Sequence, residues 1–152
     1  MDSGLTKDWA LHPQLVLDTV PVGDLPLTRV LLASDANYPW LILVPRLPGL
    51  VELIDLEENA QVQLLGEIAA AARTLKSVTR CDKLNIAALG NQVPQLHVHV
   101  IARFTDDPAW PKAVWGTVPP EPYAAVELQQ RVTSFQRALT DPSPGSTKTE
   151  SA

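Results

Sequence analysis

The chain has 152 residues, 45% hydrophobic and 19% charged, so it is long enough to bury a core and too apolar to be a disordered polymer. Its formal net charge of −5 argues against broad nucleic-acid binding, which normally requires a basic surface. The single cysteine, Cys81, excludes an internal disulfide, and neither a signal peptide nor an apolar run of membrane-spanning length is recognisable. These features predict a cytoplasmic domain that binds neither nucleic acid nor a membrane.

Five segments have the composition of short strands bounded by turn formers. In chain order they are residues 16–20, 28–33, 40–44, 83–88 and 95–104. The first is expected at a sheet edge, followed by a turn at residues 21–24. Residues 34–39 are rich in turn formers and predict an antiparallel hairpin between the second and third strands. Pro45 should end the third strand because it cannot continue the hydrogen-bond ladder.

Two segments show helical periodicity. The first is expected from about Leu56 to Val78, with Asp55 as its cap and Glu58 at capping-box spacing. Its apolar stripe leaves Glu67 on another face and consists of Leu65, Ile68, Ala69, Ala72 and Leu75. The second helix is expected from about Tyr123 to Leu139.

The predicted fold class is α+β: a mainly antiparallel sheet of about five strands, with the long helix packed on one face and a second helix near the C-terminus. Residues 1–140 are expected to form one domain. The tail, residues 141–152, is rich in Pro, Ser, Gly and Thr and is expected to be disordered.

The segment 95–104 contains the most informative pattern. Alternate side chains of a strand share a face, so Gln95, His97 and His99 should point one way, with Arg103 further along. The intervening Leu and Val residues should pack under the long helix. Two imidazoles and an amide on one face suit an anion, because they can donate to phosphoryl oxygens and a neutral imidazole is a nucleophile.

The histidine pair alone leaves three interpretations open. It could bind a phosphate, or supply two ligands to zinc, or consist of exposed strand residues without function. A zinc site needs further ligands, and neither His12 nor Cys81 has convincing spacing for that role.

The surrounding residues narrow this choice. Residues 92–103 read Gln-Val-Pro-Gln-Leu-His-Val-His-Val-Ile-Ala-Arg, which resembles the signature of the histidine-triad (HIT) superfamily of nucleotidyl hydrolases and transferases. That signature has three histidines alternating with apolar residues and followed by two more apolar ones. The resemblance extends upstream to Val44-Pro45-Arg46, the long helix, Asn85 and Gly90. The Trp110-Pro111 and Trp115-Gly116 segment is similar to a bacterial HIT-like subgroup.

The resemblance implies a mechanism in which His97 attacks the α-phosphorus of a nucleotide derivative and forms a covalent nucleotidyl-histidine. Its other ring nitrogen would be held by a hydrogen bond, usually to a backbone carbonyl. His99 would hydrogen-bond the phosphate or the leaving group. The resemblance further implies a homodimer that acts on a small-molecule nucleotide or conjugate. We expect no cofactor and assign no metal ligands.

Five more residues are candidates for nucleotide binding. Asn91 and Gln92 would bring amide donors towards the phosphate. Asp35 lies where the family usually has a residue that binds the ribose hydroxyls, and Asn37 is the alternative because the hairpin loop is short. Asn85 could hydrogen-bond within the pocket or satisfy a strand end.

Two departures from the family pattern bear on activity. Gln95 replaces the first histidine of the signature and cannot carry a proton, although it can donate a hydrogen bond and stays a catalytic candidate. Trp40 stands where the family often has another histidine. The leading hypothesis is therefore a nucleotide hydrolase or nucleotidyl transferase. The alternatives are a nucleotide-binding module with little turnover and, less favoured, a metal-binding or interaction domain.

The remaining aromatic and basic residues are given structural roles. We expect Trp40, Trp110 and Trp115 to pack in the core or a dimer interface in preference to stacking on a base. We expect Arg46 and Arg103 to be solvated arginines at strand ends.

Overall fold

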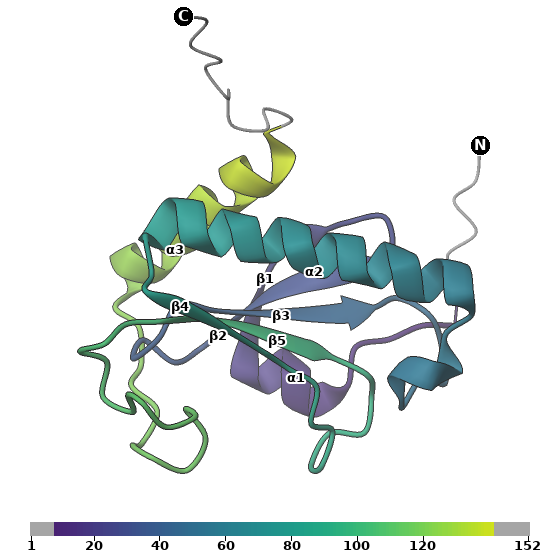
Figure 1. Cartoon of the computed structure of the whole chain (residues 1–152), viewed down its shortest axis with the longest axis horizontal. Helices are drawn as coiled ribbons and strands as arrows, with labels where there is room; N and C mark the ends of the chain where they lie inside the picture. The colour runs from purple at the N-terminus through teal and green to yellow at the C-terminus, as the bar shows by residue number, and fades with distance from the viewer. Residues whose placement is uncertain (1–7, 142–152) are drawn as a thin grey trace, which may run out of the picture.

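A computed structural model describes residues 8–141. They form a five-stranded antiparallel sheet in the order β1-β2-β3-β5-β4, accompanied by three α-helices (Figure 1). The elements in chain order are α1 (Pro13–Asp18), β1 (Thr19–Asp24), β2 (Thr28–Ala33), β3 (Trp40–Pro45), a 3-10 turn (Leu53–Asp55), α2 (Glu58–Thr79), β4 (Lys83–Ala87), β5 (Val98–Arg103) and α3 (Ala125–Thr140). The predicted α+β class is confirmed. Of the predicted tail, all but Asp141 lies outside the described residues.

The predicted hairpin is present, with β2 and β3 paired antiparallel so that Leu31 faces Ile42. The N-terminal prediction was wrong. Residues 13–18 form α1, because Pro13 suits the first helical turn and the His12 imidazole caps it by accepting from the Gln14 N–H. The strand starts only at Thr19 and includes the expected turn at 21–24. An edge strand tolerates Pro21, and a bulge between Pro21 and Gly23 shifts its register.

The long helix begins later than expected, and its buried face matches the predicted stripe only in part: Ala72 and Leu75 are buried as expected and Ile68 packs against the core. Its N-cap is Glu57, whereas Asp55 lies in the 3-10 turn and accepts hydrogen bonds from the Val51 and Glu52 N–H groups. Leu65, expected in the apolar stripe, is 68% exposed. The buried residues of α2 are Leu64, Glu67, Ala71, Ala72, Thr74 and Leu75.

The burial of Glu67 explains this difference. Its carboxylate accepts hydrogen bonds from the backbone N–H groups of Leu27 and Thr28, the Thr28 hydroxyl and the Gln63 amide. A carboxylate with this many donors can be buried, so the face that α2 turns towards the sheet includes Glu67, which the apolar stripe left out.

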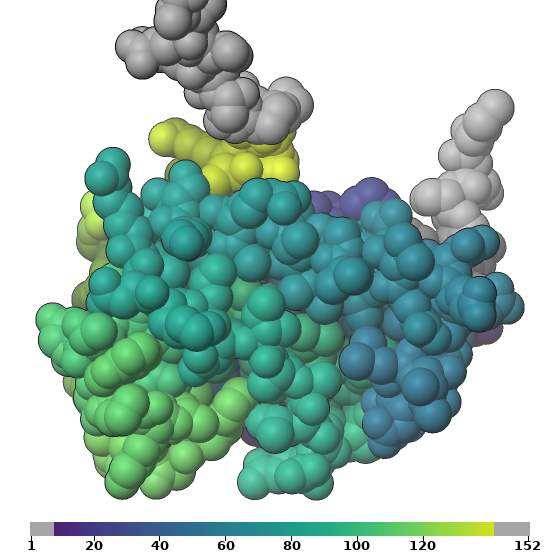
Figure 2. All heavy atoms as spheres, in the orientation of Figure 1, coloured from purple at the N-terminus to yellow at the C-terminus, as the bar shows by residue number. Residues whose placement is uncertain are grey.

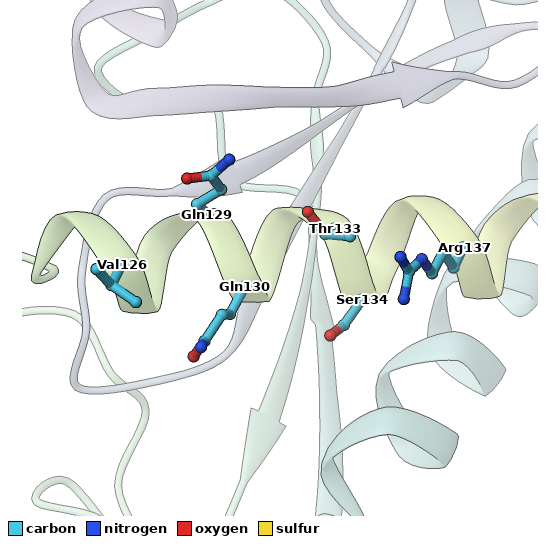
Figure 3. Close-up of a pocket in the computed structure, with 6 residues that line it drawn as sticks. All are labelled: Val126, Gln129, Gln130, Thr133, Ser134 and Arg137. Carbon is cyan, nitrogen blue, oxygen red and sulfur yellow. The ribbon is translucent and has the colours of Figure 1, made fainter.

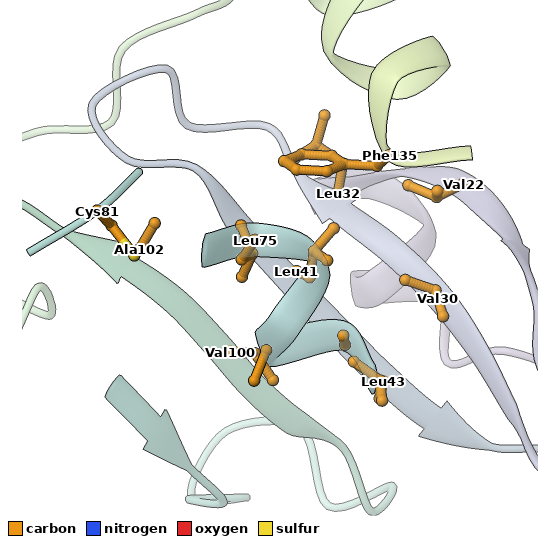
Figure 4. Close-up of a cluster of buried hydrophobic side chains, with 12 residues drawn as sticks. Val22, Val30, Leu32, Leu41, Leu43, Leu75, Cys81, Val100, Ala102 and Phe135 are labelled. Atoms are coloured by element: carbon orange, nitrogen blue, oxygen red, sulfur yellow. The ribbon is translucent and has the colours of Figure 1, made fainter. Parts of the chain in front are cut away.

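Each face of the sheet has its own core. On one face, α2 and α3 cover alternate residues of β1, β2, β3 and β5, and Phe135 of α3 lies over Leu32 (Figure 4). Cys81 belongs to this cluster and is a small buried side chain, as expected. On the opposite face, Leu15 of α1 packs with Leu31 and Ile42.

The second face is also covered by the segment that follows β5. Figure 2 shows residues around 104–120 as a green lobe at the lower left, below the teal surface of α2. Ala109 and Val114 of this segment pack against Tyr38 and Ile101. Among residues 8–141, no helix is long and apolar enough to cross a membrane.

Candidate active site

The two histidines lie on the second face of the sheet, away from α2. His99 pairs with Ile42 of β3, whose side chain packs in the core under α1. Strand β5 begins only at Val98, so the predicted start at Gln95 was three residues too early, and His97 lies just outside the strand. Val98 and Val100 are buried in the clusters that include α2, as the alternation predicted.

His97 has one ring nitrogen held by the backbone. Its Nδ1 lies 2.6 Å from the carbonyl oxygen of Gln95. A carbonyl oxygen can only accept, so Nδ1 carries the proton and Nε2 of the neutral ring carries the lone pair. The side chain is buried, and its ring centroid lies 4.9 Å from that of His99 at an interplanar angle of 75°. His97 therefore has an orientation that suits attack by Nε2.

His99 is enclosed by aromatic rings. The indole N–H of Trp40 donates to its Nδ1 at 3.1 Å, and the ring of Trp115 meets its edge at a centroid distance of 5.1 Å. Burial lowers the pKa of His99 to about 4, with a further electrostatic contribution from the neighbouring His97. His99 is therefore a neutral hydrogen-bonding group at neutral pH.

Trp40 and Trp115 were expected in the core or a dimer interface, and both contact His99. Trp40 and His99 are diagonal neighbours across β3 and β5, a relationship that depends on strand register. Trp115 comes from the irregular segment after β5 and is 40% exposed. Two sequence features could have indicated that Trp40 belongs to the site: its distance from the hairpin loop, and its position where the family often has another histidine.

Gln95 is directed to the N-terminal segment. Its side-chain oxygen accepts from the His12 N–H at 2.8 Å, and its Nε2 donates to the Ala10 carbonyl at 2.9 Å. The amide thus bonds backbone groups on both sides of Leu11, and neither of these contacts involves a histidine ring. Asn91 and Gln92 are exposed in the loop between β4 and β5.

Asp35 and Asn37, the two candidates for ribose binding, form hydrogen bonds to the segment that precedes α3. Asp35 Oδ1 accepts from the N–H groups of Asn37 and Glu121, and Asn37 Nδ2 donates to the Pro119 carbonyl. These bonds join the β2–β3 loop to the segment before α3. Each of the two side chains already has a partner within the chain.

Arg103 is not solvated, contrary to expectation. Its side chain is 1% exposed and forms a two-point ion pair with Asp107, with Nε 2.7 Å from Oδ2. It also donates to Asn85 Oδ1 and lies against the rings of Tyr38 and Trp110. Asn85 Oδ1 therefore accepts a hydrogen bond from a buried guanidinium at the end of β5.

Asp107 anchors the segment that carries Trp115. Besides Arg103, it accepts from the backbone N–H groups of Phe104, Ala109 and Trp110. Burial raises the pKa of this carboxyl, but the hydrogen bonds from Arg103 and the backbone outweigh burial and hold the pKa below its usual range.

The expectation for Arg46 was also wrong. Its side chain is 14% exposed, donates to the Leu25 and Pro26 carbonyls, and lies 3.5 Å from Asp24. These bonds fix the turn between β1 and β2.

Two other features bear on the choice of site. Within residues 8–141, no group of three or more His, Cys, Asp or Glu side chains is arranged to hold a metal ion. A surface depression runs along α3, where all the lining residues come from that one helix (Figure 3). They are Val126, Gln129, Gln130, Thr133, Ser134 and Arg137, and none of them can act as a general base. The histidine pair is the better candidate for chemistry.

Comparison with known proteins identifies the family. Residues 14–106 match the family model of the HIT domain. The chain belongs to the HIT family. HIT proteins are generally nucleotide-binding hydrolases or transferases. A comparison with curated proteins gave no significant match.

Several solved HIT structures are similar over nearly their whole length. A histidine triad protein from Bradyrhizobium japonicum is 56% identical with a TM-score of 0.85, covering 86% of this chain and 98% of its own. One from Marinobacter aquaeolei is 43% identical with a TM-score of 0.84, covering 86% and 96%. One from Sinorhizobium meliloti is 40% identical with a TM-score of 0.84, covering 86% and 97%. The resemblance identified from the histidine segment is confirmed.

Proposed function

We propose that this HIT protein cleaves a nucleotide derivative at its α-phosphorus through a covalent bond between phosphorus and Nε2 of His97. The observation that carries the proposal is the 2.6 Å hydrogen bond between Nδ1 of His97 and the Gln95 carbonyl oxygen. It leaves the lone pair on Nε2 and provides an acceptor for the Nδ1–H when the ring gains positive charge.

The reaction has two steps. In the first, the lone pair of Nε2 forms a bond to phosphorus, and the bond from phosphorus to the leaving group breaks with its electron pair on the leaving group. In the second, water or another acceptor attacks phosphorus and the electron pair returns to Nε2. With water, the leaving group takes up one proton from solvent in the first step and the attacking water releases one in the second, so the products are a nucleoside monophosphate and the protonated leaving group.

Other residues are proposed to bind the nucleotide. His99 would donate to the phosphate or the leaving group, and Asn91 and Gln92, both exposed, would supply amide donors. Asp35 and Asn37 stay candidates for the ribose, although each would exchange or share a hydrogen bond with the segment before α3.

The test combines turnover with trapping of the intermediate. The wild type and His97→Ala are incubated with dinucleoside polyphosphates and nucleotide phosphoramidates, and release of nucleoside monophosphate is measured. Intact-protein mass spectrometry at neutral pH then seeks a nucleotidyl adduct, with peptide mapping to its residue. We expect release and an adduct on His97 in the wild type only.

The matched control is His12→Ala, which removes the capping imidazole of α1 and leaves both site histidines in place. It should form the adduct. Equal release by the wild type and His97→Ala, or an adduct on another residue, would refute the nucleophile assignment.

A second candidate function is nucleotide binding with little turnover. Three observations favour it: the side-chain amide of Gln95 is engaged by residues 10 and 12, an indole replaces the imidazole at position 40, and both site histidines are less than 8% exposed. Calorimetric binding of adenosine or guanosine monophosphate, without product release from any substrate, would support this alternative. Trp115 adjoins His99 and is partly exposed, so its fluorescence should report the binding.

We further propose that the protein acts in the cytoplasm as a homodimer. The outer edge of β4 has no neighbouring strand in the described sheet, and Ile86 and Leu89 are about half exposed there. Light scattering on the wild type and on Ile86→Lys tests this: a dimer that the substitution dissociates supports it, and a monomeric wild type refutes it.

A further inference from the structure

The hydrogen bonds on the two site histidines have opposite directions. Both use Nδ1, but the partner of His97 is a carbonyl oxygen, whereas the partner of His99 is an indole N–H. A carbonyl can only accept and an indole N–H can only donate. Nδ1 of His97 must therefore carry a proton, and Nδ1 of His99 must be bare.

We propose that Trp40 is a positioning residue that holds His99 in the tautomer with its proton on Nε2. Neutral His99 then presents an N–H donor beside the lone pair on Nε2 of His97, with the two ring centroids 4.9 Å apart. The opposite tautomer would present a lone pair there, which repels a phosphoryl oxygen. This inference deepens the proposed function and rests on it for its catalytic meaning.

The identity of residue 40 suits this role. An imidazole at this position, as the family often has, can donate or accept and can change its charge with pH. The indole has one N–H and no acceptor, so the sense of its hydrogen bond to His99 is fixed. A tryptophan in place of the histidine thus removes a titrating group and supplies a group that can only donate to His99.

Packing fixes the geometry of this contact. The Trp40 ring meets Tyr38 edge to face at 6.4 Å, Trp115 at 5.6 Å and His99 at 5.6 Å. Tyr38 is 2% exposed and His99 6% exposed, so water has little access to compete for Nδ1 of His99. The lowered pKa of His99 is consistent with a neutral ring whose tautomer matters at neutral pH.

Nitrogen NMR of the imidazole rings tests the inference directly on the free wild-type protein. Protonated and bare ring nitrogens have well-separated chemical shifts, and their couplings to the ring protons distinguish Nδ1 from Nε2. We expect His99 to show a bare Nδ1 and a protonated Nε2, and His97 to show the reverse. A protonated Nδ1 on His99 overturns the proposal without any variant.

Two variants separate the effect of the Trp40–His99 hydrogen bond from the effect of aromatic packing around His99. Trp40→Phe keeps an aromatic ring but removes the N–H, so His99 should lose its single tautomer and its pKa should rise. Trp115→Phe alters the other indole that touches the ring, and the tautomer of His99 should be retained. An unchanged tautomer in Trp40→Phe refutes the role of Trp40.

Kinetics connects the tautomer to turnover. In Trp40→Phe we expect kcat for nucleotide release to fall with KM nearly unchanged, because the substrate still binds but a fraction of His99 presents the wrong nitrogen. If NMR shows the proton on Nε2 of His99 but the wild type releases no nucleotide, the proposed function is refuted and the tautomer inference stands. If the wild type releases nucleotide with the proton on Nδ1 of His99, the tautomer inference is refuted and the proposed function stands.

Discussion

The side-chain oxygen of Gln95 accepts a 2.8 Å hydrogen bond from the backbone N–H of His12, while the backbone carbonyl of the same glutamine holds Nδ1 of His97. One residue therefore connects the segment before α1 to the proposed nucleophile. Gln95 stands at the first position of the histidine signature. Its planar amide offers an acceptor and a donor side by side, so it bonds both the His12 N–H and the Ala10 carbonyl, which an imidazole could not do in the same geometry.

Gln95→Ala should release the N-terminal segment. The His12 N–H and the Ala10 carbonyl lose their partner, and water replaces it only in part, so we expect a loss of about 1–2 kcal/mol in the free energy of unfolding. Hydrogen exchange should become faster over residues 8–18, as measured by mass spectrometry. Gln92→Ala, at an exposed position of the same loop, is the control. Unchanged exchange in Gln95→Ala would contradict the prediction.

The stability of the protein should fall as the pH drops from 6.5 to 4. In this range the unfolded chain protonates His99 at its ordinary pKa of 6.5, whereas the folded protein keeps it neutral down to about 4. The unfolded state then binds more protons, and acid favours unfolding by up to about 3 kcal/mol from this residue.

Urea unfolding at a series of pH values measures this effect. His99→Gln removes the titrating group and keeps a polar side chain of similar size, so the difference between its pH profile and that of the wild type isolates His99. Parallel profiles of the two proteins between pH 6.5 and pH 4 would rule out the lowered pKa.

Strand-like composition and flanking turn formers were sufficient to predict most of the sheet, and alternation was informative in the histidine segment. Strand β2 has the predicted bounds, and the hairpin to β3 is as expected. The same patterns identified the histidine pair, because alternation places His97 and His99 opposite the apolar residues that pack under α2. Such patterns report which local structure a segment favours, and here tertiary contacts agree with local preference.

Several errors come from tertiary contacts that local sequence patterns do not report. Glu67 looked like a solvent-facing residue because its donors, Leu27 and Thr28, lie some 40 residues away. Arg103 was expected to be solvated because its ion pair with Asp107 forms only when the irregular segment after β5 folds back on the strand. Trp40 was not assigned to the site because its contact with His99 depends on the pairing of β3 with β5.

Glu67→Ala should destabilise the protein much more than the loss of an exposed charged residue of the same helix. It leaves two backbone N–H groups and the Thr28 hydroxyl buried without an acceptor, and we expect a loss of about 3 kcal/mol in the free energy of unfolding. Glu67→Gln keeps one acceptor oxygen and should lose less. Chemical denaturation followed by circular dichroism measures both.

Arg73→Ala provides the matched control, since Arg73 is exposed on the same helix and alanine favours a helix. Its stability should lie close to that of the wild type. A Glu67→Ala variant as stable as Arg73→Ala would mean that water can satisfy the donors of residues 27 and 28.

The buried ion pair between Arg103 and Asp107 should be the main anchor of the segment that carries Trp115. Asp107→Ala leaves the guanidinium without a counter-charge at a site where its side chain is 1% exposed, and we expect a loss of about 3–5 kcal/mol in the free energy of unfolding. The neighbouring Asp106 is exposed, so Asp106→Ala should change stability by less than about 0.5 kcal/mol.

Proteolysis and fluorescence distinguish local from global loss of order in Asp107→Ala. If the ion pair holds the segment on the sheet, residues 104–118 should be cleaved first under conditions where the sheet stays folded. Trp115 should then lose its contact with His99, and its emission should shift to longer wavelength as the indole gains water. Cleavage elsewhere first, or equal stability of Asp107→Ala and Asp106→Ala, would show that other contacts hold the segment.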